Sequence, residues 1–283
     1  LADLLQVRPH RLRSVQIERD FSDPHASLHY VVTPFIQATA QRLADGFRAG
    51  STARAWRLTG DYGSGKSSFA LALARLGLAE KKLLPSELQP CRAAQRFEPV
   101  LVVGEREPVG QSVLRGLRAT AERCFGRIPR GLTAALDVAL EPPLVIAAVE
   151  AVRAALVGER KAAGLLLILD ELGKNLEFAA GQSEADDIYL LQHLAEYAAR
   201  SGDEPVMVVA IVHQAIAGYA SQLTSAHRRE WEKVAGRYEE VVFSPPLEQA
   251  ATLIAAALDV DLGACPAALV RGAERTMARA VEK

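Results

Sequence analysis

Gly60-Asp61-Tyr62-Gly63-Ser64-Gly65-Lys66-Ser67 matches the pattern G-x-x-x-x-G-K-S. Glycines at these positions let the backbone curl until several N–H groups face one hollow, which opens onto a helix N-terminus and attracts an anion. The lysine places a positive charge beside the β- and γ-phosphates of a nucleotide, and the serine hydroxyl can bind Mg²⁺. The motif, together with the following Ser68, predicts a nucleotide-binding phosphate loop.

The residues on either side of this stretch fit the prediction. Residues 56–59 read as a short strand, and residues 68–76 place Phe69, Ala72, Leu73 and Leu76 at helical spacing. A strand, a loop and a helix in that order make a chance glycine-rich turn the weaker explanation.

The composition limits the classes of protein to consider. The chain has 283 residues, of which 49% are hydrophobic and only 6% aromatic, so its core must consist mainly of Ala, Leu and Val. A formal net charge of −1 gives no overall electrostatic signature of nucleic acid or membrane binding. Cys91, Cys124 and Cys265 lie too far apart for a disulfide framework or a zinc site, which favours a cytoplasmic protein.

Apolar strands alternate with helical patterns along the chain, which predicts a wound α/β domain with a parallel sheet. Strands are expected at 99–103, 165–169, 206–212 and 241–243, and helices at 34–50, 111–124, 133–140, 144–163, 183–199 and 248–258. We expect an N-terminal segment at 1–33, a nucleotide-binding domain at 34–246 and the start of a helical lid at 247–283.

Asp170-Glu171 follows the apolar run Leu165–Leu169. Ligands of open α/β sheets bind outside the carboxyl ends of the strands, so both carboxylates should lie beside the phosphate loop. Asp170 would then hold Mg²⁺ with Ser67, and Glu171 would act as general base on the attacking water. A solvated turn is the alternative, and the upstream phosphate loop makes it weaker.

A second segment narrows the family. The stretch Gly236-Arg237-Tyr238-Glu239-Glu240-Val241-Val242-Phe243-Ser244-Pro245-Pro246 resembles the G-R-F-D-x-x-I-x-F-x-x-P segment of AAA+ ATPases. The Asp-Glu pair is similar to that of AAA+ and STAND ATPases, and residues 206–212 end at His213-Gln214, where that group carries its sensor residue. The resemblance covers about residues 33–258. It implies a P-loop NTPase fold with a five-stranded parallel sheet in the order 5-1-4-3-2, sandwiched by helices, and a short partial helical lid. It also implies that ATP is the substrate and Mg²⁺ the cofactor. The family forms homo-oligomers that bind ATP between subunits, so the same is expected here.

Four site residues follow from the resemblance. Arg237 corresponds to an arginine finger that reaches the γ-phosphate of a neighbouring subunit, with Arg228 and Arg229 as substitutes; a surface arginine paired with Glu239 or Glu240 is the alternative. Gln214 or His213 would orient the attacking water, or be structural. Tyr30 lies in the region that cups adenine in this group, or is ordinary packing. Trp231, among basic residues, is a candidate for an exposed interface residue.

The chain also departs from a minimal AAA+ core. Lys66 and Asp170 are 104 positions apart (170 − 66), so an inserted helix or two is expected within 105–163. The lid has few residues, and Arg271, Arg275 and Arg279 are candidates for the second sensor only by residue type. The first residue is Leu1, and residues 275–283 read as an uncapped helix, which suggests a piece of a longer protein. As a whole, the sequence resembles the N-terminal ATPase domain of large bacterial anti-phage defence ATPases.

Three functions follow from these features. The first is an ATPase that couples its nucleotide state to conformational change or assembly of a larger complex. The resemblance to anti-phage defence ATPases would place this activity in anti-phage defence. The second is a STAND-type nucleotide-gated oligomerisation switch with slow turnover. The third is a DNA translocase or helicase module, which would bind nucleic acid or partner proteins through regions beyond this sequence.

Overall fold

The computed structural model describes residues 5–7, 15–23, 30–182, 186–220, 223–244, 246–260 and 271. The chain divides into two compact units, residues 15–244 and a smaller one made of residues 1–14 and 245–283. Within the smaller unit, β1 (Leu5–Val7) pairs antiparallel with β7 (Leu258–Val260), and α11 (Leu247–Ala257) precedes β7. The expected lid at 247–283 is described only over α11, β7 and Arg271.

The larger unit is built on a parallel sheet whose order is β3-β4-β5-β2-β6. The strands are β2 (Ala55–Thr59), β3 (Phe97–Val103), β4 (Gly164–Asp170), β5 (Val206–Val212) and β6 (Glu239–Val242). Numbered from β2 as first strand, this is the order 5-1-4-3-2. The predicted α/β class, the five parallel strands and their order are therefore confirmed.

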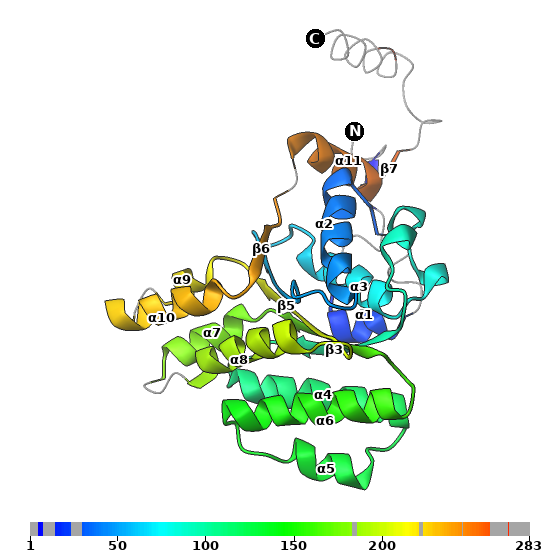
Figure 1. The fold of residues 1–283 in the computed structure, drawn as a ribbon. Coiled ribbons are helices and arrows are strands. Elements are labelled where there is room, and N and C mark those ends of the chain that lie inside the picture. The colour runs from blue at the N-terminus through cyan, green and yellow to red at the C-terminus, as the bar shows by residue number, and fades with distance from the viewer. Residues whose placement is uncertain are drawn as a thin grey trace. The chain divides into compact units, whose positions relative to one another are not determined.

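Helices cover both faces of this sheet (Figure 1). One face carries α4 (Val109–Phe125), α6 (Pro142–Gly158) and α8 (Asp186–Arg200), and α5 (Arg130–Leu136) packs on α6. The other carries α1 (Ile17–Phe21), α2 (Pro34–Ala44) and α3 (Lys66–Gly77). The remaining elements are α7 (Gly173–Ala180), α9 (Ile216–Tyr219), α10 (Ser225–Ala235) and the 3₁₀ turns η2 (Asp45–Phe47), η3 (Lys81–Leu83) and η4 (Ser86–Cys91).

The strands are apolar on both sides because each side packs on helices. Leu165, Leu167 and Leu169 point into the core under α4, α6 and α8, whereas Leu166 and Ile168 point into the core under α3. This alternation explains why β4 reads as an unbroken apolar run in the sequence.

The first long helix is shorter than expected. The helix predicted to reach about Gly50 ends at Ala44 and continues as the single turn η2. The buried Arg54 side chain donates to the carbonyl oxygens of Gly46 at 3.2 Å and Arg48 at 3.1 Å. These carbonyls are bound by a guanidinium instead of by a following helical turn, so the helix stops.

Candidate nucleotide site

The phosphate loop joins β2 to α3, and its glycines adopt backbone conformations that other residues avoid. Gly63 has φ +76° and Gly65, the N-cap of α3, has φ +90°. Gly60 lies so close to β6 that an added Cβ would stand 2.7 Å from the carbonyl oxygen of Phe243. The Phe243 N–H in turn donates to Thr59 at 2.6 Å. The loop is therefore fixed at its start by the edge strand and turned at its end by left-handed glycines.

Lys66 folds back over this loop. Its ammonium donates to the carbonyl oxygens of Gly60 at 2.5 Å and Asp61 at 2.8 Å, and to the Ser64 hydroxyl at 3.2 Å. The side chain is buried, and burial lowers the pKa of Lys66, while Asp170 and Asp61 act in the opposite direction. The loop and the first turn of α3 thus present one desolvated positive charge among backbone donors.

Ser67 and Asp170 come together although 103 positions separate them. The Ser67 hydroxyl donates to Oδ1 of Asp170 at 3.1 Å, and the Glu171 N–H donates to the same oxygen at 2.9 Å. Burial raises the pKa of Asp170, and these two hydrogen bonds lower it in part. A hydroxyl and a buried carboxylate side by side are oxygen ligands of the kind that Mg²⁺ accepts, so the two residues fit that ion.

Glu171 sits in a left-handed turn directly after β4, with φ +53°. Its carboxylate is ion-paired with Lys174, three residues further on at the start of α7. Its carbonyl oxygen is held close to Gly104, where an added Cβ would stand 2.4 Å away. Lys174 and Gly104 were not among the residues predicted from the sequence. The spacing of three residues from Glu171 was the available signal for Lys174.

His213 also reaches the loop. Its ring stacks on that of Tyr62, with centroids 3.5 Å apart and 21° between the planes, although Tyr62 is 79% exposed. The His213 N–H donates to the Tyr219 hydroxyl at 3.2 Å. Burial, followed by the charge of Lys66, lowers the pKa of His213. Gln214 is exposed and its side chain lies against Gly218.

Arg237 lies away from the phosphate loop of its own chain. It precedes β6, which runs parallel to β2, so it lies at the amino edge of the sheet while the loop lies at the carboxyl edge. Its guanidinium pairs with Glu196 of α8 at 2.8 Å. Glu239 and Glu240, the partners considered from the sequence, bind Arg42 at 2.9 Å and Arg57 at 3.0 Å instead.

Two aromatic residues were also predicted to have functional roles, Tyr30 at the nucleotide site and Trp231 at an interface. Tyr30 is half-buried against the core that includes Ile36, Phe69 and Phe243. Trp231 is 1% exposed and belongs to the core under α8 and α10, so the prediction of an exposed interface residue is wrong. Its indole points inward because Trp231 and Val234, three residues apart, form the buried face of α10. Arg228 and Arg229 remain on the exposed face.

Comparisons with known proteins add a distant structural likeness. No protein-family model and no curated protein matches the chain. Among solved structures, the chain is similar to the Orc1 protein of Aeropyrum pernix, solved in complex with DNA, with 19% identity and a TM-score of 0.48. The match covers 92% of this chain and 59% of that one. In the described part of the chain, no helix is both long and apolar enough to cross a bilayer.

Proposed function

We propose that this chain is an ATP-binding and ATP-hydrolysing AAA+-like module, whose nucleotide state drives conformational change or assembly in a larger complex. The observation that carries the proposal is the 3.1 Å hydrogen bond between Ser67 and Asp170. It joins the hydroxyl of the phosphate loop to the carboxylate at the end of β4, beside Glu171. This pair would hold the Mg²⁺ that accompanies ATP, and the adjacent carboxylate of Glu171 is what hydrolysis needs in addition to binding.

Each residue at this edge has a separate task. The backbone donors of residues 63–67 and the Lys66 ammonium would hold the phosphates. Ser67 and Asp170 would hold Mg²⁺, which supplies positive charge to the β- and γ-phosphates. Glu171 would accept a proton from the attacking water, and His213 or Gln214 would orient that water. Tyr30 would contact the adenine base.

Arg237 would act on the nucleotide of a neighbouring copy of this chain. A planar, permanently charged group suits the charge that builds on the transferred phosphoryl group. Its place at the amino edge, opposite its own loop, is compatible only with action in trans. The partly exposed Arg237–Glu196 pair would have to open on assembly, at a cost of about 1 kcal/mol.

The test is ATP hydrolysis per subunit as a function of protein concentration. A site completed in trans gives a specific rate that rises with concentration. Mixing Lys66→Ala and Arg237→Ala subunits, each inactive alone, should restore part of the activity, because one supplies the arginine and the other the loop. Mixing Lys66→Ala with Glu171→Gln subunits is the matched control, and it should restore nothing beyond background. A specific rate independent of concentration, with no recovery in the first mixture, would contradict the assignment of Arg237.

The second candidate is a nucleotide-gated oligomerisation switch with slow turnover. One observation favours it: the Glu171 carboxylate is engaged by Lys174 instead of being open to accept a proton. Tight ATP binding and ATP-dependent assembly with near-zero hydrolysis at every concentration would support the switch. Hydrolysis stimulated by DNA and strongly weakened by salt would instead support a DNA translocase. A role in anti-phage defence rests on the sequence resemblance alone.

A further inference from the structure

A polar cavity of about 440 Å³ lies at the amino edge of the sheet, opposite the phosphate loop. It is lined by side chains from elements that all meet at this edge. Arg75 is in the last turn of α3, Arg123 is in the last turn of α4, Arg96 precedes β3, and Lys161 precedes β4. The volume is that of a small-molecule site. From Lys66 to Arg75 the axis of α3 rises about 14 Å, so the cavity is separate from the nucleotide site.

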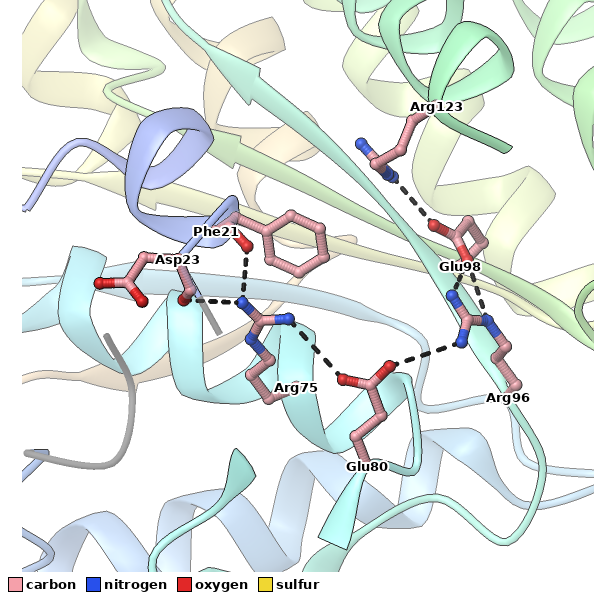
Figure 2. Close-up of polar contacts among 7 residues, drawn as sticks. All are labelled: Phe21, Asp23, Arg75, Glu80, Arg96, Glu98 and Arg123. Atoms are coloured by element: carbon pink, nitrogen blue, oxygen red, sulfur yellow. Dashed lines mark hydrogen bonds and ion pairs between the residues drawn. The ribbon is translucent and has the colours of Figure 1, made fainter. Parts of the chain in front are cut away.

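The charges that line the cavity do not cancel. Four cations, Arg75, Arg96, Arg123 and Lys161, face two carboxylates, Glu80 and Glu98, which leaves an excess of two positive charges among the lining side chains (4 − 2). Lys161 also pairs at 3.8 Å with Glu159, which lies outside the lining. Figure 2 shows how the carboxylates alternate with the arginines, Glu80 between Arg75 and Arg96, and Glu98 between Arg96 and Arg123.

The two carboxylates are engaged to different degrees. Glu98 is nearly inaccessible and is fully bound: Arg96 donates to it at 2.9 and 3.1 Å, and Arg123 donates at 3.0 Å. Glu80 stands 3.7 Å from Arg75 and 3.6 Å from Arg96, beyond hydrogen-bond length. The part of the cavity beside Glu80 therefore has cationic donors that its own carboxylate does not saturate.

Arg75 is the most constrained of these donors. It is 5% exposed, donates to the carbonyl oxygens of Phe21 at 2.5 Å and Asp23 at 3.1 Å, and stacks over the Phe21 ring at 4.5 Å. Its buried Nε–H has no acceptor among the described residues, and burial lowers the pKa of Arg75. A buried arginine with an unmet donor is costly unless an anion compensates it.

We propose that this cavity binds a small molecule through a phosphoryl group, held by Arg75, Arg96, Arg123 and Lys161. A phosphoryl group carries close to two negative charges at neutral pH, which matches the excess of the lining, and its three oxygens can accept from donors in different directions. Nε and Nη2 of Arg96 already donate to one oxygen of Glu98, so the open donors suit a tetrahedral acceptor better than a planar one. This second site does not depend on ATP hydrolysis at the first.

The experiment is a calorimetric titration of the full chain with inorganic pyrophosphate, without Mg²⁺. In a Lys66→Ala host, where the phosphate loop is disabled, the cavity should still bind one pyrophosphate per chain. Lys161→Glu in that host should weaken binding by about tenfold or more, since it replaces a charge-assisted contact with repulsion. Lys161 is a suitable position because its own ion pair, to Glu159 at 3.8 Å, is partly exposed. Arg130→Glu, at an exposed position in α5, makes the same kind of charge reversal and should leave the affinity within about twofold.

Wild type is titrated in parallel, which keeps the test valid if the Lys66→Ala host folds poorly. It should show two sites, one of which Lys161→Glu weakens by about tenfold or more. No saturable binding in the host and a single site in wild type that Lys161→Glu leaves intact would overturn the proposal. Equal weakening by Lys161→Glu and Arg130→Glu would show that pyrophosphate is attracted non-specifically, and it would also overturn the proposal. Binding of succinate in place of pyrophosphate would overturn the phosphoryl assignment.

Discussion

The carboxyl edge and the amino edge of the sheet carry different kinds of charged groups. At the carboxyl edge, Lys66, Ser67, Asp170 and Glu171 gather around a glycine loop, and backbone donors outnumber side-chain cations. At the amino edge, arginines from the ends of α3 and α4 and from the start of β3 gather around Glu80 and Glu98 (Figure 2). The first edge collects acidic oxygens beside an anion-binding loop, and the second collects guanidinium groups around carboxylates.

The difference follows from the direction of the chain. In a parallel sheet each helix begins near the carboxyl edge and ends near the amino edge. Helix N-termini attract anions and C-termini attract cations, so basic residues of the last turns, such as Arg75 and Arg123, accumulate at the amino edge. The two phosphate positions that we propose would therefore differ in their donors: backbone N–H groups at one edge and side chains at the other.

The largest expected effect is that of Lys66→Ala on nucleotide affinity. The variant removes a desolvated cation of the carboxyl edge, and loss of a charge-assisted contact of about 2.7 kcal/mol lowers affinity about 100-fold. Fluorescent ATP-analogue binding measures it. Lys82→Ala, at an exposed position in η3, should bind like wild type. ATP affinity retained within a few-fold in Lys66→Ala would remove the loop from the site.

Gly104→Ala should destabilise the fold next. An added Cβ would stand 2.4 Å from the carbonyl oxygen of Glu171 and 2.5 Å from the Asn175 side-chain oxygen, so the backbone of Glu171 must shift. We expect a loss of about 2 kcal/mol in the free energy of unfolding, together with slower ATP turnover. Gly131→Ala in α5, where nothing lies within 4 Å of the added Cβ, should be neutral or stabilise by about 0.5–1 kcal/mol. Equal effects of the two variants in urea unfolding would contradict the packing described here.

Arg123→Ala tests the amino edge. The change leaves the buried Glu98 with one cation instead of two and removes the bond to the carbonyl oxygen of Pro99 at 2.6 Å. Because Arg123 itself is partly exposed, we expect a moderate loss of about 2 kcal/mol, measured by urea unfolding. Arg106→Ala, whose 79% exposed side chain pairs with Glu177 at 3.5 Å beside the carboxyl edge, should cost less than about 0.5 kcal/mol. A cost for Arg123→Ala as small as that would show that Glu98 does not need both arginines.

The last prediction concerns the reactivity of a thiol at the amino edge. Burial and the neighbouring Glu98 raise the pKa of Cys124 to about 11. A raised pKa means less thiolate at a given pH, so at pH 8 alkylation of Cys124 should be about 100-fold slower than in the unfolded chain. Its rate should rise about tenfold per pH unit up to about pH 11, whereas the unfolded chain levels off near pH 9. Site-resolved mass spectrometry follows the labelling, and equal rates at pH 8 in folded and unfolded chains would contradict the environment of Cys124.

The carboxyl edge could be predicted from the sequence because its information is local. The phosphate loop is one contiguous motif, and Asp170-Glu171 ends an apolar strand, so parallel topology alone brings Ser67 to Asp170. The order of the strands was predicted from the resemblance to AAA+ ATPases alone. Even here, the stacking of Tyr62 on His213 joins positions 151 residues apart (213 − 62) and has no sequence signature.

The amino edge could not be predicted. Arg75, Arg96, Glu98 and Arg123 belong to no motif, and each alone reads as a solvated charge at the end of an element. Their meeting depends on the lengths of α3 and α4, which decide where each last turn stops. The same limit explains the error at Trp231, since the helical face that is buried depends on what packs against α10, which here is α8 and α9.

The measurement that tests the central claim most directly is ATP binding and turnover by Glu171→Gln, beside wild type. The amide cannot accept the proton from water, so we expect retained ATP affinity, turnover reduced at least about 100-fold, and ATP recovered unhydrolysed from the protein. Glu177→Gln, a half-exposed carboxylate of α7, is the matched control and should turn over like wild type. Undiminished hydrolysis by Glu171→Gln would contradict the claim that the carboxyl edge of this sheet is an ATP-hydrolysing site built on Glu171.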